Sequence, residues 1–326
     1  MGAAEYNSYL PYRTLLPTTR VRELSVLRPR RVFVDCALAW AGILAAWAAA
    51  AIWTEWWVVA LAFPVVGTRF YALFIIGHDG MHRRLLKGRR ANDLLNDLVC
   101  LGPIGGITRI NNRNHLLHHR HLSSDEDPDR HRHCCANKAT RPAYLAFLTG
   151  LASLVPVVSN VFLREKHVAG ESLRSSYTPR DVAIIVGWQV VLLGGLWLAI
   201  GWWAYPVLWL LPVYVHMYLG DLIRSFLEHS HPESDEKADE HRLITYTSNP
   251  LERIFFAPIG MNFHTTHHLW PSIPYYNLAI ADRELRAHPG SEGLVWRRSY
   301  MGYLLRYFSA LPLPECQPGR AEAPAA

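Results

Sequence analysis

The stretch VAIIVGWQVVLLGGLWLAIGWWAYPVLWLLPVYVHMYLG, from Val182 to Gly220, contains no Asp, Glu, Lys or Arg. It is about twice the roughly 20 residues that an α-helix needs to cross the hydrocarbon core of a bilayer. The segment GWWAYP, which ends at Pro206, interrupts the apolar run near its middle. We therefore interpret the stretch as a helical hairpin with membrane spans near 182–202 and 204–222.

A second apolar block, residues 33–76, breaks at the sequence TEWW and predicts spans near 33–53 and 57–76. Pro64 and Arg69 lie inside the second of these spans, and the Arg69 side chain could extend to the membrane surface or face the protein interior. Soluble helices seldom run so long with so little charge. We therefore favour an all-α integral membrane protein with four transmembrane helices in two hairpins over a soluble core of buried helix pairs.

The positive charge of the chain is unevenly distributed. The formal net charge is +6, and Lys and Arg are concentrated in residues 1–32, in residues 78–141 and in the C-terminal third, whereas the short turns near Thr54 and Tyr205 contain none. The positive-inside rule then places both termini and the central segment in the cytoplasm. No nucleic-acid-binding motif accompanies the charge, so nucleic acid is not an expected partner. Arg greatly outnumbers Lys, which is typical of a GC-rich bacterial gene and favours a bacterial inner membrane over the endoplasmic reticulum.

The 17 histidines of the chain form clusters with helical spacing. HDGMH at 78–82 places two imidazoles at i and i+4, and HLLHH at 115–119 and HTTHH at 264–268 each place three imidazoles on about one helical turn. Chance gives roughly 0.05 HxxHH motifs in a chain of this histidine content, so the pair indicates a function. Facing one another, the three motifs can surround two metal ions, and neutral imidazole suits Fe and Zn among other divalent metals.

We call these three motifs the histidine boxes. Their order HxxxH, HxxHH, HxxHH, with two spans between the second and third boxes, resembles that of the membrane fatty acid desaturase and hydroxylase family. The segment HTTHHLWPSIPYYNL is similar to the third box of the acyl-lipid desaturase branch, and HHRHLSSDEDPD is similar to the second box and its following loop. The resemblance covers roughly residues 33–285, and its box spacings are specific to the superfamily but not to a substrate.

The resemblance implies that two iron ions, with O2 as co-substrate, are held by the eight box histidines and a ninth histidine after the last span. Within DLIRSFLEHSHP we favour His229 for this role and keep His231 as the alternative. Asn262, just before the third box, could hold a water on the metal, and His216, inside the last span, is interpreted as a core histidine. The expected metal ligands are His78, His82, His115, His118, His119, His229, His264, His267 and His268.

Ligating imidazoles need a partner for their second ring nitrogen. Asp79, Asp221 and Glu228 are the expected partners, and Asp221, Arg224 and Glu228 share one side of a helix by their spacing. The acidic run 125–129, which includes Asp125, Glu126 and Asp127, supplies further acceptors or is a solvated loop. The cluster HRHCC at 131–135 fits no zinc spacing and is interpreted as a loop.

The boxes also constrain the topology. The family places all of them on one cytoplasmic face, and ligands separated by a bilayer could not meet, so an even number of spans must lie between the second and third boxes. The apolar stretch 142–163 is long enough to span but must then lie in the interface or dip in and return. We expect a cytoplasmic segment 1–32, one membrane domain 33–311 with a cytoplasmic helical cap, and a disordered tail 312–326.

The predicted function is O2-dependent oxidation that introduces a C=C bond into a fatty acyl chain or related lipid. A hydroxylase or ketolase of carotenoids or other lipids is the alternative on the same scaffold. A membrane zinc hydrolase is more distant, because Asp79 replaces the Glu of HExxH, and a metal transporter would need ligands within the spans. No GxGxxG motif follows a strand, and too little chain follows HPG at 288–290 for a fused cytochrome b5. Electrons are therefore expected from a separate ferredoxin, rubredoxin or cytochrome b5.

Overall fold

A computed structural model describes residues 10–122, 127–133, 135, 138–151, 167–168, 171–172, 177–229 and 243–313. Four helices in these ranges are long and apolar enough to cross a membrane, which confirms the expected all-α membrane architecture. They are α3 (Pro29–Ile52), α4 (Trp56–Met81), α10 (Pro179–Ala199) and a continuous helix, Pro206–His229, that contains the π-helical segments η5 (Pro206–Leu210) and η6 (Val213–Tyr218) and ends in α11 (Leu219–His229).

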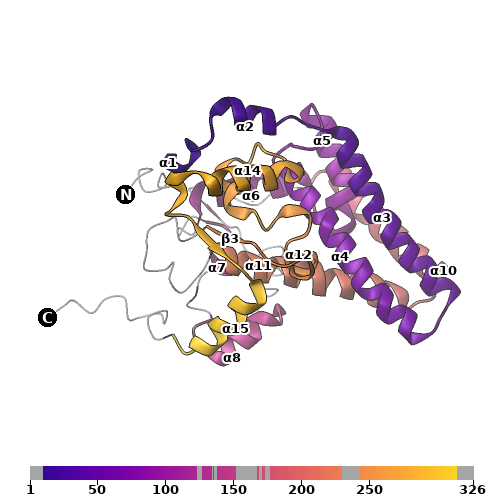
Figure 1. Cartoon of the computed structure of the whole chain (residues 1–326). Helices are drawn as coiled ribbons and strands as arrows, with labels where there is room; N and C mark the ends of the chain where they lie inside the picture. Colours follow the sequence, from indigo (N-terminus) through magenta and orange to yellow (C-terminus); the bar gives the residue numbers. More distant parts are fainter. Residues whose placement is uncertain are drawn as a thin grey trace.

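Local signals explain where these helices begin. Pro29 occupies the first turn of α3, where the missing N–H costs no intrahelical hydrogen bond. At the start of α10, the Asp181 N–H donates to Thr178 Oγ1 (3.3 Å) and the Thr178 N–H donates to Asp181 Oδ2 (2.9 Å), which forms a capping box. The long helices extend together to one side, and the shorter helices gather as a cap at the other end (Figure 1).

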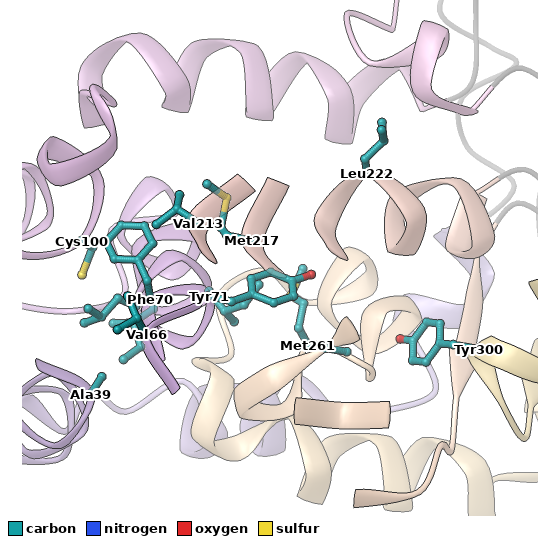
Figure 2. Packing of buried hydrophobic residues seen from close by; sticks show 14 of the residues in the cluster. Ala39, Val66, Phe70, Tyr71, Cys100, Val213, Met217, Leu222, Met261 and Tyr300 are labelled. Carbon is teal, nitrogen blue, oxygen red and sulfur yellow. The ribbon is translucent and has the colours of Figure 1, made fainter. Parts of the chain in front are cut away.

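Close packing holds the two helical hairpins together. A Cβ atom added to Gly67 of α4 would lie 2.0 Å from His216 Cδ2, so glycine is required where α4 meets η6. Trp40 of α3 stacks on Trp188 of α10, with ring centroids 5.3 Å apart, and on Trp209 of η5, at 6.4 Å. Figure 2 shows Val213 and Met217 of η6 beside Phe70 and Tyr71 of α4 in this buried core.

The cap is built from short helices and two small pairs of strands. β3 runs parallel to β4, and β1 pairs antiparallel with β2. The elements are α1 (Leu10–Arg13), α2 (Thr18–Leu24), α5 (Arg89–Asn96), η2 (Asp97–Leu101), η3 (Gly102–Ile104), α6 (Thr108–His121), α7 (Arg130–His133), α8 (Arg141–Leu148), β1 (His167–Val168), β2 (Glu171–Ser172), β3 (Ile244–Tyr246), α12 (Pro250–Phe256), η8 (Pro258–Gly260), α13 (His264–Leu269), α14 (Tyr275–Ala287), η9 (Pro289–Ser291), β4 (Val295–Arg297) and α15 (Tyr300–Ala310).

The apolar stretch 142–163 is described only in its first part. That part forms α8, which lies beside α15 in the cap (Figure 1), where the Tyr144 hydroxyl donates to the Leu304 carbonyl (3.2 Å). Residues 152–163 lie outside the described ranges, so the non-spanning path of the whole stretch stays a prediction. Residues 1–9 and 314–326 lie outside them too, as do three residues considered as site groups, Asp125, Glu126 and His231.

Candidate metal centre

The three histidine boxes meet where the end of α4 approaches the cap. α4 continues to Met81, five residues past the predicted span, so His78 lies within the helix and His82 caps it. Three asparagine side chains donate hydrogen bonds to carbonyls in the last turn of this helix. Asn96 Nδ2 donates to the Gly77 carbonyl (3.0 Å), Asn92 Nδ2 to the Gly80 carbonyl (2.8 Å), and Asn112 Nδ2 to the Met81 carbonyl.

The first group of imidazoles contains five residues from α4, α6 and α13. Their ligand atoms all lie within 4.8 Å of one another. His115 Nε2 lies 2.7 Å from His82 Nε2 and 3.0 Å from His119 Nε2, and His119 Nε2 lies 3.2 Å from the Nε2 of the α13 histidine. The members of the group are His78, His82, His115, His119 and His267.

The second group lies beside the first and contains four residues from α6, α11 and α13. Ligand atoms of His118, His229 and His268 lie within 4.8 Å of one another. His264 Nε2 joins them at 2.8 Å from His229 Nε2 and 3.0 Å from His268 Nε2. The His119 and His268 rings stack with centroids 4.1 Å apart, which places the two groups next to each other.

The spacing and chemistry of both groups fit bound metal ions. A metal that holds imidazoles at about 2.1 Å separates adjacent nitrogens by about 3.0 Å in octahedral geometry. The closest Nε2 pairs lie between 2.7 and 3.2 Å apart, which matches that separation. The nine imidazoles expected from the sequence are therefore brought together in two adjacent sets, each of which could hold one metal ion.

Most of these imidazoles are held neutral, the form that binds metal. Six imidazoles outside the membrane spans have a pKa well below the ordinary value of 6.5, mainly because they are buried and secondly because of the charges of neighbouring side chains. They are His82, His115, His119, His264, His267 and His268. The Nδ1 atoms of His78 and His267 are buried and accept or donate no hydrogen bond within the described ranges.

These lowered pKa values predict how stability depends on pH. In the unfolded chain the same imidazoles take up protons below about pH 6.5, whereas the folded protein resists protonation. The stabilisation is therefore fully present above about pH 6.5. Below about pH 6.5, each such imidazole lowers the free energy of unfolding by up to about 1.4 kcal/mol per pH unit. We expect the thermal unfolding midpoint of the metal-free protein in detergent to fall steadily from about pH 6.5 to about pH 5.5. A midpoint that stays constant over this range would contradict the prediction.

His118 differs from the other box histidines because a carboxylate faces its second nitrogen. Its Nδ1 lies 3.1 and 3.2 Å from the two carboxylate oxygens of Asp127. Burial lowers the pKa of His118, but the charge of Asp127, its hydrogen bond to His118 and the charge of Asp129 together outweigh burial, and the pKa is raised. Burial likewise raises the pKa of Asp127, yet contact with His118 and His133 outweighs it and the pKa lies below the usual range. Asp127 thus holds His118 with Nε2 directed to the second group.

His133 was missed by the sequence interpretation of 131–135 as a loop. His133 is the last residue of α7 and is buried. Its Nδ1 lies 3.5 Å from Asp127 Oδ2, and its Nε2 lies 2.8 Å from Ser225 Oγ of α11. Burial lowers the pKa of His133 to about 4. The density of histidine in HRHCC was the one available signal, because the contacts join segments far apart in sequence.

We expect Asp127→Asn to weaken metal binding at the second group by about 10- to 100-fold, because such supporting hydrogen bonds typically contribute that much to a metal site. Chelator competition on purified protein measures the loss. Glu23→Gln is the control, since it also replaces a paired carboxylate by an amide, and Glu23 is an exposed residue that pairs with Arg20 in α2. Equal metal retention in Asp127→Asn and wild type would show that Asp127 does not position His118.

A buried chain of alternating charges supports the second group. Arg224 Nη2 donates to Asp221 Oδ1 (2.7 Å) and its Nη1 donates to Glu228 Oε2, so these three residues do lie along one side of α11. Glu228 Oε2 lies 3.4 Å from His264 Nδ1, and the Tyr300 hydroxyl donates to Glu228 Oε1 (2.6 Å). Glu228 therefore contacts His264 directly, whereas Asp221 is linked to Glu228 only through Arg224.

Two other predicted site residues have distinct surroundings. Asp79 Oδ2 accepts the Tyr275 N–H (2.6 Å), so it fastens α14 to α4, and no imidazole in the described ranges bonds to it. Asn262 donates through Nδ2 to the Tyr246 carbonyl (2.9 Å), while its Oδ1 is buried without a hydrogen-bond partner in the part of the chain that is described. A buried oxygen of this kind is suited to hold a water or an ion.

A cavity of about 740 Å³ is formed by α4, η3, α7, α10 and the helix Pro206–His229. Its polar end is lined by Asp129, Arg132 and Asp221, and Arg132 Nη2 donates to Asp221 Oδ2 (2.7 Å). The rest is mainly apolar, and Phe74, one helical turn before His78, brings the wall close to the first group. Its apolar lining includes Phe74, Ile185, Trp209, Val213, Met217 and Leu222. The cavity has the shape and chemistry to receive an apolar chain.

Four long apolar helices beneath a histidine-lined centre define a membrane protein suited to metal-dependent chemistry on an apolar molecule. Residues 54–300 match the model of the fatty acid desaturase family, and the chain belongs to that family. It is thus a lipid-modifying oxidoreductase.

Three relatives span much of the chain. It is 28% identical over 249 residues to a beta-carotene ketolase of Paracoccus sp. (strain N81106 / MBIC 01143), covering 73% of this chain and 88% of that protein. It is 27% identical over 275 residues to the sn-1 acyl-lipid omega-3 desaturase (ferredoxin) of Nostoc sp. (strain 36), covering 73% and 72%. It is 26% identical over 283 residues to the dihydrorhizobitoxine desaturase of Bradyrhizobium elkanii, covering 82% and 80%.

Proposed function

We propose that this protein is an O2-dependent di-iron oxidoreductase that introduces a C=C bond into a fatty acyl chain or a related lipid. The observation that carries the proposal is the convergence of nine imidazoles in two adjacent groups. Family membership and the desaturases among the relatives support it. The all-nitrogen donor set also suits zinc, so metal identity belongs to the proposal.

In this proposal each group of imidazoles holds one iron ion. The first is bound by His78, His82, His115, His119 and His267, and the second by His118, His229, His264 and His268. Asn262 Oδ1 would hold a water at the centre. When bound, the two iron ions supply the activation of O2. Asp127 and Glu228 keep His118 and His264 oriented through their Nδ1 atoms.

The cavity of about 740 Å³ would hold the substrate chain. Its apolar wall excludes water, and its polar end at Arg132 and Asp221 suits the head of an amphipathic lipid. Desaturation removes two hydrogen atoms from adjacent carbons, and O2 accepts these together with two electrons from an external donor and two protons from water to give two water molecules. A ferredoxin, rubredoxin or cytochrome b5 would supply those electrons.

Ketolation of a carotenoid-like lipid is the second candidate. The observation that favours it is the match to 88% of the length of a beta-carotene ketolase. The same histidines would serve both reactions, so the outcome depends on which substrate carbon the cavity presents. Product analysis separates them, because a desaturated lipid loses two hydrogen atoms whereas a hydroxylated or ketolated lipid gains an oxygen atom.

The test combines metal analysis with product analysis on one preparation. Full-length protein purified in detergent from iron-supplemented cells is analysed for metal per chain and by Mössbauer spectroscopy, then supplied with ferredoxin, its reductase, O2 and acyl lipids or β-carotene. Two coupled irons and a lipid with a new C=C bond are expected. One zinc without iron, once mismetallation has been excluded by reconstitution, would overturn the proposal in favour of a hydrolase.

We expect Val213→Trp to block substrate without disturbing the metal centre. Val213 is buried in the wall of the cavity of about 740 Å³, and an indole there would occupy space that the chain needs. Product formation should fall at least about tenfold, which corresponds to a loss of about 1.4 kcal/mol in substrate binding. Iron content should be unchanged. Wild-type turnover by this variant would show that substrate does not use the cavity.

We also propose that the cap, the metal centre and both chain termini face the cytoplasm. The distribution of Lys and Arg supports this orientation. Single cysteines at Glu55, in the turn between α3 and α4, and at Ser309, in the cap, can be labelled with an impermeant maleimide in whole cells. Only the Glu55→Cys variant should react before the cells are opened. A pair of cysteines flanking 142–163 that react from opposite sides would overturn the topology.

A further inference from the structure

Arg69 is an arginine within an apolar span. It lies in α4, and its side chain is exposed at the surface that the bilayer would cover. No acidic side chain in the described ranges comes within ion-pair distance of Arg69. Because an unpaired guanidinium is costly in hydrocarbon, such a residue must reach the membrane surface or meet an anion.

The Arg69 side chain enters a cavity of about 220 Å³ formed by α3, α4, α12 and η8. A Cβ atom added to Gly42 of α3 would lie 3.1 Å from Arg69 Cγ, so the side-chain stem crosses α3 at a glycine. The cavity wall on α3 includes Asp35 and Leu38, which precede Gly42 and lie nearer the cap. The guanidinium is therefore directed toward the cap side of the membrane.

A second arginine lines the same cavity. Arg253 of α12 donates through Nε to the Ser248 carbonyl (2.9 Å) and, like Arg69, has no acidic partner within ion-pair distance in the described ranges. Among the described residues that line the cavity, Asp35 is the one acidic group, and it already accepts two hydrogen bonds. Its Oδ2 accepts from Arg31 Nε (2.8 Å) and from the Tyr275 hydroxyl (2.7 Å). Within the described part of the chain, the guanidinium groups of Arg69 and Arg253 thus have no anionic partner.

The surroundings of the cavity are those of a membrane surface. α12 exposes Leu251 and Ile254 beside it, as an amphipathic helix in the interface does. On the spans, Leu38 and Val65 are exposed near the cavity. Arg69 and Phe74 lie five residues apart and point about 140° away from each other around α4, so this cavity is separate from the one proposed for substrate.

We propose that this cavity, lined by Arg69, Arg253 and Thr68, binds the phosphate of an anionic phospholipid on the cap side of the membrane. Arginine is well matched to phosphate oxygens, and basic residues near the surface attract anionic lipid. Its volume of about 220 Å³ suits a phosphate group, while the acyl chains would lie along the exposed apolar surface of α3 and α4. The apolar rim distinguishes a lipid from free inorganic phosphate as the occupant.

Native mass spectrometry of the full chain in detergent tests this proposal. Phosphatidylglycerol, phosphatidylcholine or inorganic phosphate is added, and the fraction of protein that retains each is measured. We expect preferential retention of phosphatidylglycerol, reduced about fivefold by each of Arg69→Gln and Arg253→Gln. Arg30→Gln is the matched control, because Arg30 is an exposed arginine at the start of α3 outside the cavity. It should retain the lipid as the wild type does, and metal content should be the same in all variants.

Two outcomes would overturn the proposal. One is equal retention of phosphatidylglycerol by wild type and the Arg69 and Arg253 variants. The other is binding of inorganic phosphate with no preference for the anionic lipid. If Arg69→Gln fails to fold, Arg253→Gln still decides the matter, because Arg253 is exposed on α12. Gly42→Ala adds a variant that displaces the Arg69 stem without removing charge, and it should also lower lipid retention.

Discussion

His267→Ala should abolish turnover and release about one metal ion per chain. His267 lies in α13, is buried, and its Nε2 is 3.2 Å from His119 Nε2 in the first group of imidazoles. Removing a ligand leaves that metal with too few donors. Since loss of even a supporting hydrogen bond costs about 10- to 100-fold in metal affinity or activity, loss of the imidazole should lower activity more than about a hundredfold.

The measurement pairs metal analysis with Mössbauer spectra and product assays on the purified variant. His288→Ala is the matched control, because His288 is an exposed histidine near the end of α14, where its Nδ1 accepts the Gly290 N–H (3.0 Å). That variant should keep wild-type metal and activity. If His267→Ala retained both metal ions and full activity, the first group could not be a catalytic metal site.

Periodicity made the eight histidines of the three motifs predictable, whereas His229 was expected from the family resemblance. HxxHH places its members on one turn wherever a helix forms, and α6 and α13 are both helical at these boxes. Spacing could also place Asp221, Arg224 and Glu228 on one side of α11, because three- and four-residue separations are local. The four long apolar helices likewise follow from composition over windows of about 20 residues.

The end of α4 was predicted less well, for a physical reason. The apolar run ends at Ile76, yet the helix continues to Met81. Its last carbonyls accept hydrogen bonds from Asn92, Asn96 and Asn112, which lie in α5 and α6. A helix end stabilised by side chains from later segments leaves no local signal, because isolated asparagines are common in loops.

The residues that contact the second group of imidazoles could not be predicted from the sequence for the same reason. Tyr300 and Glu228 are separated by 72 positions, and His133 and Ser225 by 92. No periodicity relates residues so far apart, and only the packing of α7, α11 and α15 brings them together. Asp127 was a candidate acceptor in an acidic run that could equally have been a solvated loop. Its burial against His118 decides between these interpretations.

Arg224→Met should destabilise the protein by about 3–5 kcal/mol, because removing one member of a buried ion pair leaves uncompensated charge. Arg224 is buried between Asp221 and Glu228. Glu228 would lose its ion pair while remaining buried, whereas Asp221 would keep only its pair with Arg132. Methionine keeps a similar length and fills the space, so the loss reports charge more than packing. Glu228 also faces His264, so metal retention at the second group should decrease.

Arg20→Met is the matched control for this prediction. Arg20 also pairs with two carboxylates, at 2.7 Å to Glu23 and 2.7 Å to Glu284, but its side chain is 38% exposed. Solvent screens such pairs, so its unfolding midpoint in detergent should stay close to that of the wild type. The two variants lose the same charge and the same number of ion pairs. If the unfolding midpoints of both variants fell equally, burial of the ion pairs of Arg224 would not explain their contribution to stability.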